Sequence, residues 1–530
     1  MSKDTTNPTR TAHRKRSGGP PEATGPLAFL DRRRTIAPAG YSRWLIPPAA
    51  LAVHLCIGQV YATSVYKTSL VAHFGASQTA IGVIFSIAIV MLGLSAAVMG
   101  TWVERNGPRK AMFVAACAWA LGFLVGSIGI ATTQLWLLYL GYGVIGGIGL
   151  GIGYISPVST LIKWFPDRPG LATGLAIMGF GGGALVASPL SRQLLSAYDP
   201  AYRPSVSTSI ASGHALTLLF VTLGIGYFVI MMFGVANIRV PATGWTPDGF
   251  DPGSAPTKAL VTTKSVSAAN AIRTPQFWCL WIVLFCNVTA GIGILEQASP
   301  MIQDFFRGSD GKSSVAVAAA GGFVGLLSLF NMAGRFVWST ASDTIGRKPI
   351  YVVYLGGGIV LYVVLALVGQ TATAIFVLLA AVILSFYGGG FATAPAYLRD
   401  LFGVFQVGAI HGRLLTAWSA AGVAGPLIIN GFLDAQGKPG TLTAAAYRPA
   451  LLTMVGVLAV GVVANLLIRP VAARFHQPDG PAKATRTQVD VATTGPAPGS
   501  ARLLVSWALI VVLLAYGVIQ TGVTAATLFR

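Results

Sequence analysis

Long apolar stretches separated by short polar ones run through most of this chain. Stretches of the length that a bilayer requires, about 20 residues, lie on both sides of a polar segment at 238–275. The expected spans lie near 44–66, 79–102, 111–131, 135–157, 170–190, 214–237, 276–298, 316–340, 349–369, 373–397, 408–432 and 449–469. The pattern predicts an all-α membrane protein with six helices in each half.

Polar segments divide the chain around these spans. The expected units are a disordered cytoplasmic N-terminal tail at 1–42, a six-helix bundle at 43–237, a cytoplasmic central loop at 238–275, a second six-helix bundle at 276–469 and a linker at 470–500. A further apolar run at 501–530 is long enough to form an additional transmembrane helix. The two-half plan has no place for this helix, so its role and its partner stay open.

Composition and charge agree with a membrane protein. The 530 residues are 54% hydrophobic and only 10% charged, whereas a soluble domain has about 25% charged residues. The formal net charge is +20, but the basic residues cluster in the tail, the short loops and the stretch after Arg469, as the positive-inside rule expects. We therefore expect a multi-pass protein of the inner (plasma) membrane, with its N-terminus inside and its C-terminus outside, and no nucleic-acid partner.

The cysteines give no sign of a metal site. All four lie within apolar runs and none has metal-ligand spacing with another, so neither a metal nor a cofactor is expected.

A hairpin motif occurs at matching places in the two halves, after the second span of each. Glycine allows a tight turn there, and the carboxylate and cations can pair across helix ends and hold one conformation shut. The first copy consists of Gly100, Glu104, Arg105, Gly107, Arg109 and Lys110, and the second of Asp343, Gly346, Arg347 and Lys348. The alternative is a short basic loop without a gating role.

The first copy resembles the signature of the major facilitator superfamily, Gly-x-x-x-(Asp/Glu)-Arg-x-Gly-x-(Arg/Lys)-(Arg/Lys). The resemblance covers about residues 44–470 and implies the major facilitator fold, two pseudo-symmetric six-helix bundles, here with one extra C-terminal helix. Within that superfamily, the segments 58–66, 163–174, 331–335 and 411–418 resemble the oxalate/formate antiporter family. This narrower resemblance implies exchange or uptake of small organic anions.

Arg335 is the main candidate for contact with such an anion. It lies eight residues before Asp343, on the order of 12 Å of helix rise, and the matching position in the first half is Ala96. A charge inside a membrane normally faces a partner or a water-filled path, and a guanidinium suits a carboxylate. The family resemblance implies a basic residue here that contacts the anion. Snorkelling to the headgroups or pairing with Asp343 is the alternative.

Trp418 bears on the charge of the substrate. The family resemblance implies a lysine at this position in dicarboxylate carriers, after the stretch that reads Leu415-Thr416-Ala417 here. One arginine and an indole leave a dianion with an uncompensated charge in a medium of low dielectric constant, whereas Arg335 alone balances a monoanion. We therefore expect a monocarboxylate, unless His411 or Arg413 supplies a second cation.

Other polar residues in the spans are candidates to complete the site. Tyrosine hydroxyls can donate to a carboxylate while their rings enclose a small apolar group. The further binding candidates are Gln59, Tyr61, Tyr154, Asn287 and Tyr387, and the candidates for proton coupling are His54 and Glu296. For each of them, a role in helix packing or at the membrane interface is the alternative.

The sequence thus predicts a secondary transporter of small organic anions, working by alternating access as an antiporter or a proton-coupled carrier. The expected substrates are mono- or dicarboxylates such as formate, oxalate, lactate or pyruvate. An exporter of hydrophobic compounds within the same superfamily is the alternative, followed by a membrane sensor or enzyme. No catalytic triad, metal set or phosphate loop is visible. The expected partners are the substrate and the lipid bilayer, and the expected state is a monomer.

Overall fold

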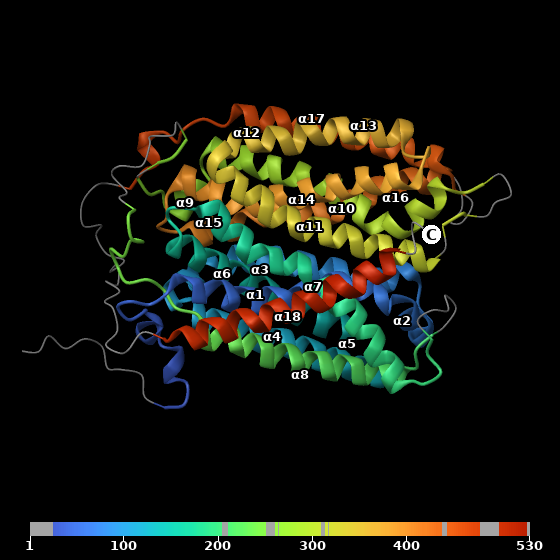
Figure 1. Cartoon of the computed structure of the whole chain (residues 1–530), viewed down its shortest axis with the longest axis horizontal. Helices are drawn as coiled ribbons and strands as arrows, with labels where there is room; N and C mark the ends of the chain where they lie inside the picture. Colours follow the sequence, from blue (N-terminus) through green and yellow to red (C-terminus); the bar gives the residue numbers. More distant parts are fainter. Residues whose placement is uncertain are drawn as a thin grey trace, which may run out of the picture.

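Two helical bundles lie side by side in the computed structural model, one from each half of the chain (Figure 1). The structure describes residues 25–203, 210–250, 260–262, 264–308, 313–315, 317–436, 442–477 and 498–526. Among these residues, twelve helices are long and apolar enough to cross a membrane. The 29-residue helix α11, Val317–Ile345, runs through the second bundle in addition to them.

The first bundle contains six long helical rods. They are formed by α1 (Ile46–Ile57) with the 3-10 segment η4 (Gly58–Val65), α3 (Gln78–Asn106), α4 (Pro108–Ala131), α5 (Leu135–Leu138) with η5 (Tyr139–Gly146) and α6 (Gly147–Trp164), α7 (Pro169–Tyr198), and α8 (Gly213–Asn237). The short helix α2 (Lys67–Phe74) follows η4.

The second bundle repeats this plan. It is formed by α10 (Pro275–Phe305), α11, α12 (Arg347–Val352) with η6 (Val353–Gly357) and α13 (Gly358–Val368), α14 (Thr373–Phe402), α15 (Val407–Leu414) with α16 (Thr416–Gln436), and α17 (Ala444–Leu467). The short α9 (Ala268–Ala271) precedes it, and α18 (Ser500–Ala525) follows it as the extra helix expected from the sequence.

The glycines of the hairpin motif are required by backbone conformation. Gly107, between α3 and α4, has φ +86°, and Gly346, between α11 and α12, has φ +97°. Side chains other than hydrogen rarely tolerate this left-handed region, so both copies need glycine at the turn. We call the end of the molecule that carries these two turns the hairpin end.

Part of the N-terminal tail is folded against the hairpin end. Short 3-10 helices form at Ala28–Leu30 and Arg32–Thr35, and Arg109 donates to the carbonyl oxygens of Phe29 and Arg34. The prediction of a disordered tail is therefore wrong for residues 28–35, because a buried hairpin arginine binds their backbone. The part of that prediction that concerns residues 1–24 lies outside the described residues.

The two bundles meet along two helix pairs. One pair is α7 with α11, and the other is α3 with the rod formed by α15 and α16. A methyl group on Gly170 would collide with the carbonyl oxygen of Ser339, and one on Gly412 with that of Ala96. Glycine thus allows the backbones of the two halves to touch, as expected for helices that slide on one another in a membrane.

Candidate functional site

Arg335 lies on α11 with a fully buried side chain. Its Nε donates to Oδ1 of Asn331 at 2.9 Å, and its Nη1 donates to the carbonyl oxygen of Ile177, on α7, at 3.4 Å. Its Nη2 has no hydrogen-bond partner among the described residues. Asp343, the partner considered from the sequence, binds Arg347 at 2.6 Å instead. The charge of Arg335 is therefore buried with no carboxylate paired to it in the described part of the chain.

Aromatic rings from both bundles enclose this guanidinium. The guanidinium carbon, Cζ, lies 5.1 Å from the ring centre of Phe391 and 5.8 Å from that of Phe180, within the range of a cation–π contact. Trp418 packs on both rings, with centroid distances of 4.7 Å to Phe391 and 5.4 Å to Phe180. We use the name aromatic cage for Tyr61, Tyr154, Phe180, Tyr387, Phe391 and Trp418.

Three tyrosines complete the aromatic cage. The ring of Tyr154 lies 5.6 Å from Phe180 and 5.8 Å from Trp418. The ring of Tyr61 lies 5.2 Å from Phe180, and its hydroxyl is 3.4 Å from that of Tyr387. The structure therefore brings Arg335, Trp418 and the three predicted tyrosines together at the junction of the two halves.

Several donors around the cage lack an acceptor. Besides Arg335 Nη2, the Tyr154 hydroxyl and the Trp418 Nε1 are buried without a hydrogen-bond partner among the described residues. A buried donor without a partner costs about 1–3 kcal/mol, and native structures seldom leave several in one place. Their common need is an acceptor, and a carboxylate supplies acceptors together with the negative charge that Arg335 lacks.

Two of the predicted binding residues lie outside the cage. Gln59 donates from Nε2 to the Tyr66 hydroxyl at 2.7 Å and accepts from the Tyr142 hydroxyl at 2.9 Å, so both ends of its amide are used inside the first bundle. Asn287, on α10, packs against the backbone of Gly390, and its Oδ1 has no partner among the described residues. Asn287 is thus next to the cage helix α14.

The two candidates for proton coupling lie in different places. His54 is buried between α6 and α7, where its ring nitrogens face the carbonyl oxygens of Tyr154 and Ala176, and its ring lies 5.2 Å from that of Tyr154. Glu296 is exposed on α10, nine residues before the end of that helix, and accepts from Asn430 at 3.4 Å. Of the two, only His54 contacts the aromatic cage.

His411 and Arg413, the possible sources of a second cation, are both on α15. The ring of His411 is buried 5.7 Å from that of Tyr154, with its Nδ1 unpaired among the described residues. His411 therefore contacts the cage through Tyr154.

The hairpin carboxylates each bind the start of a helix in the opposite half. Asp343 accepts from the backbone nitrogens of Gly170 and Leu171, at the start of α7, at 2.7 and 2.9 Å. Glu104 accepts from the nitrogen of Gly408, at the start of α15, at 3.2 Å. A carboxylate at a helix N-terminus satisfies free N–H groups and interacts favourably with the helix dipole. These bonds hold the hairpin ends of the two halves together.

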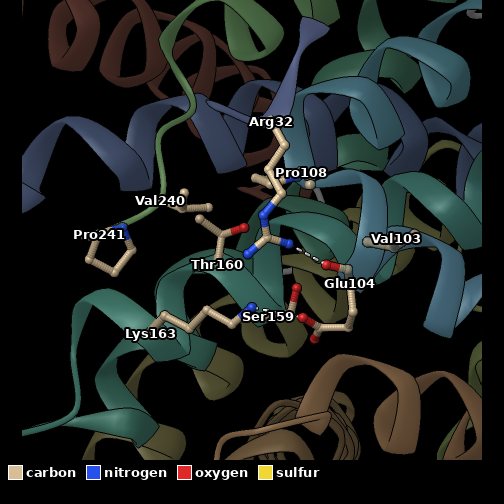
Figure 2. A pocket seen from close by; sticks show the side chains of 10 residues that line it. Arg32, Val103, Glu104, Pro108, Ser159, Thr160, Lys163, Val240 and Pro241 are labelled. Carbon is tan, nitrogen blue, oxygen red and sulfur yellow. Dashed lines mark hydrogen bonds and ion pairs between the residues drawn. The ribbon is translucent and has the colours of Figure 1, made fainter. Parts of the chain in front are cut away.

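Basic residues in and around the hairpins hold the carboxylates and the neighbouring chain. Lys163 pairs with Glu104 at 2.7 Å, and Arg32 donates to the Glu104 carbonyl at 2.5 Å, so both side chains extend toward Glu104 in a small pocket (Figure 2). Arg347 pairs with Asp400 at 3.0 Å as well as with Asp343. The remaining motif residues do not bind the two carboxylates. Gly100 packs against Ala409, and Arg105 is exposed. Lys110 donates to the Asn106 side chain, and Lys348 donates to the carbonyl oxygens of Leu466 and Ile468.

Phe180 and Phe391 belong to the cage but were not among the residues predicted to bind substrate. Phe391 follows Tyr387 by four positions and therefore shares its helix face, which is a signal that the sequence carries. Phe180 lies within the glycine-rich run of the fifth span. Nothing in that run distinguishes a cage residue from a packing residue.

Comparisons with known proteins find relatives among transporters. Relatives include the "Uncharacterized MFS-type transporter YhjX" of Escherichia coli, 25% identical over 385 residues, which cover 71% of this chain and 85% of that protein. The "Oxalate:formate antiporter" of Oxalobacter formigenes is 25% identical over 385 residues, 72% of this chain and 83% of its own. The "Apicoplast pyruvate carrier 1" of Toxoplasma gondii is 27% identical over 352 residues, 59% and 62% of the two chains.

Solved structures share the fold at low sequence identity. The transporter FucP in its outward conformation aligns with 80% of this chain and 99% of its own, with a TM-score of 0.59 and 14% identity. The family described as Major Facilitator Superfamily matches residues 49–426. With more than half of its length matched, the chain belongs to the Major Facilitator Superfamily and is a multi-pass membrane transporter, not an enzyme.

Proposed function

We propose that this transporter carries small carboxylate anions, monocarboxylates in preference to dicarboxylates, by alternating access between its two halves. The observation that carries the proposal is the buried Arg335 guanidinium, which has a free Nη2 and no paired carboxylate among the described residues. A carboxylate bound beside it would supply the missing acceptor and the missing charge.

The cage limits the charge and size of the anion. Arg335 is, among the described residues, the cationic side chain that lies over cage rings, those of Phe180, Tyr387 and Phe391. One cation balances one carboxylate, whereas a second carboxylate in the same apolar surroundings would be left uncompensated. The faces of Phe180, Phe391 and Trp418 suit a small apolar group next to the carboxylate. Formate, lactate and pyruvate fit this description better than oxalate.

The position of the cage between the halves suits alternating access. Residues 43–237 would move as one unit and 276–469 as another, with the α7–α11 and α3–α15 contacts opening at one end at a time. Binding of the anion would neutralise Arg335 and let the halves close around it. An empty site would keep a buried charge and resist closing, which favours exchange. Uptake with a proton is the other mode, with His54 as the cage-contacting candidate for carrying it.

The names of relatives agree with this substrate class. They include the oxalate:formate antiporter and the pyruvate carrier described above, and "Monocarboxylate transporter 11" of Homo sapiens, which is 28% identical over 162 residues. The arginines of the short loops would place the hairpin end in the cytoplasm.

A counterflow experiment tests the proposal. Purified protein in liposomes preloaded with unlabelled lactate would be given labelled formate, lactate, pyruvate or oxalate, and a lipophilic cation as the probe of an exporter. We expect counterflow of the monocarboxylates, its loss in Arg335→Gln, and a partial loss in Arg335→Lys, which keeps the charge but not the fork-shaped donor set. Transport of the lipophilic cation with no transport of any carboxylate would refute the proposal in favour of the exporter.

A further inference from the structure

Helix α18 lies across the contact between the two halves, outside the two-bundle plan. It packs on α1 and α7 of the first bundle and on α11 of the second. Figure 1 shows it running obliquely over the molecule, from the side of α4 and α8 toward α7 and α11. The helices α7 and α11 are also the pair whose contact holds Arg335. An appended helix that only anchored a tail would not need to touch both halves.

The first part of α18 is fixed to the first half. Near the hairpin end, Arg502 donates from Nε and Nη2 to Oδ1 of Asn237, at 3.0 and 2.8 Å. Trp507 donates from Nε1 to the carbonyl oxygen of Trp44 at 3.0 Å. Hydrogen bonds to specific partners give a helix a fixed position in a membrane, where apolar contact alone gives little preference.

Apolar packing continues this attachment along the helix. Ile510 is buried in a cluster with Leu51, Ala52 and Leu55 of α1. Farther along, Gly517 packs closely on the backbone of Leu185, since a methyl group there would lie 2.8 Å from the Leu185 carbonyl oxygen. From residue 502 to residue 517, α18 is therefore positioned like a seventh helix of the first bundle.

The last turns of α18 contact the second half. A Cβ atom on Gly325, in α11, would lie 2.9 Å from Cγ2 of Thr521 and 3.6 Å from its Cβ. Leu514 of α18 and Met332 of α11 both pack against Gly182 of α7. A Cβ atom on Gly182 would lie 3.1 Å from Leu514 Cδ2 and 2.7 Å from Met332 Sδ. Met332 precedes Arg335 by three residues on the same helix. The contact with α11 therefore reaches the neighbourhood of the cage.

We propose that α18 is a latch: it moves with the first half, and its Thr521 turn holds α11 at the end of the molecule opposite the hairpins. When that far end opens, α7 and α11 must separate, and a helix fixed to α7 must then leave Gly325. When the hairpin end opens instead, the contact can persist. The latch thus favours the state that is closed at the far end and limits the rate at which the cage is exposed there.

A disulfide between α18 and α11 tests this proposal. The 3.6 Å separation from a Cβ at Gly325 to Thr521 Cβ falls within the range of about 3.5–4.5 Å seen in disulfides. Gly325→Cys and Thr521→Cys would be combined in a chain whose four native cysteines are replaced by serine or alanine. The control is Leu51→Cys with Ile510→Cys, two positions of the same buried cluster, joined by a short, reducible bifunctional thiosulfonate; it links α18 to the half with which it moves. A gel-shift assay would verify both links.

The readout uses accessibility as well as transport. Labelled-lactate counterflow would be measured before and after reduction. In a parallel chain with the added change Tyr61→Cys, a membrane-impermeant maleimide would be applied to each side separately, in whole cells and in inside-out vesicles, with the other cysteines already joined. We expect the oxidised 325–521 link to abolish counterflow, which reduction restores. We also expect it to abolish the far-side labelling that is seen in a Tyr61→Cys chain without cysteines at 325 and 521. The 51–510 link should leave both counterflow and labelling unchanged.

Either of two results would overturn the latch. One is unchanged far-side labelling of the oxidised 325–521 protein, because the contact would then not have to break. The other is an equal block by the 51–510 link, because α18 would then not move with the first half. Absence of lactate counterflow in the reduced protein would count against the proposed substrate only, since the labelling result does not depend on which molecule is carried.

Discussion

The carboxylate of Asp343 accepts hydrogen bonds from the backbone nitrogen of Gly170, at 2.7 Å, and from that of Leu171, across the boundary between the two halves. Glu104 does the same in the opposite direction, with a single bond to Gly408 at 3.2 Å. The two hairpins therefore close the same end of the molecule by the same kind of hydrogen bond, but Asp343 makes two such bonds and Glu104 makes one.

This difference predicts unequal effects of neutralising the two carboxylates. Asp343→Asn removes the charge from two bonds to N–H groups and from the pair with Arg347, and a hydrogen bond to a charged group contributes about 1.5–3 kcal/mol. We expect labelling of Tyr61→Cys from the hairpin side to become faster by about tenfold, which corresponds to about 1.4 kcal/mol. Glu104→Gln should give a smaller increase. Equal increases, or none for Asp343→Asn, would show that these caps do not control opening.

The unpaired donors of the cage predict an effect on affinity. Tyr154→Phe removes a hydroxyl and keeps the ring, and Trp418→Phe removes the indole N–H and keeps an aromatic face. If these donors bind the carboxylate, each change should raise the KM for lactate by about tenfold, the equivalent of a single hydrogen bond to a charged group. Phe391→Leu is the control, because it removes ring packing without removing a donor. An unchanged KM in both donor variants would place the anion elsewhere.

Gln59 predicts the opposite combination of effects. Its amide joins the Tyr66 and Tyr142 hydroxyls within the first bundle, so Gln59→Leu takes one buried hydrogen-bond partner from each hydroxyl, at a net cost of about 0.5–1.5 kcal/mol per hydrogen bond. We expect a lower melting temperature in detergent with little change in the KM for lactate. Adding Tyr66→Phe and Tyr142→Phe should recover part of the lost stability, since no polar group then remains unpaired. A large rise in KM without a loss of stability would instead make Gln59 a substrate ligand.

Much of the fold could be predicted from the sequence because a bilayer imposes a strict rule. Spans must be apolar, about 20 residues long and helical, and the two hairpin motifs mark the duplication. Gly107 and Gly346 could also be predicted from the repeat, since a glycine at both turns indicates a backbone conformation that other residues rarely adopt. The fold of residues 28–35 was not readable, because it depends on a distant arginine, Arg109, that binds their carbonyls.

The site was predictable where a residue broke a rule of its surroundings. Arg335 is a charge in an apolar run, and the tyrosines are polar groups in spans, so each is noticeable alone. Phe180 and Phe391 break no rule, and their role comes from the packing of α7 against α14 and α16. Gln59, like Tyr61, is a polar group in an apolar span, yet its hydrogen-bond partners lie inside the first bundle. Periodicity cannot show which helix a polar side chain faces, and this limit applies equally to the path of α18.

Trp418 predicts how the preferred charge of the substrate can be changed. Its ring packs on Phe180, Phe391 and Tyr154, and all three contacts lie within 5.8 Å between centroids. Trp418→Lys would place a second cation in this cage, so an empty site would carry two buried charges, and a monoanion would leave one of them unbalanced. We expect lactate counterflow to fall and oxalate counterflow to rise relative to it. Trp418→Met, similar in length and uncharged, controls for the loss of the ring and should lower transport without favouring oxalate. If Trp418→Lys is folded in detergent but keeps the wild-type ratio of lactate to oxalate transport, charge balance at Arg335 does not set the preference for monocarboxylates.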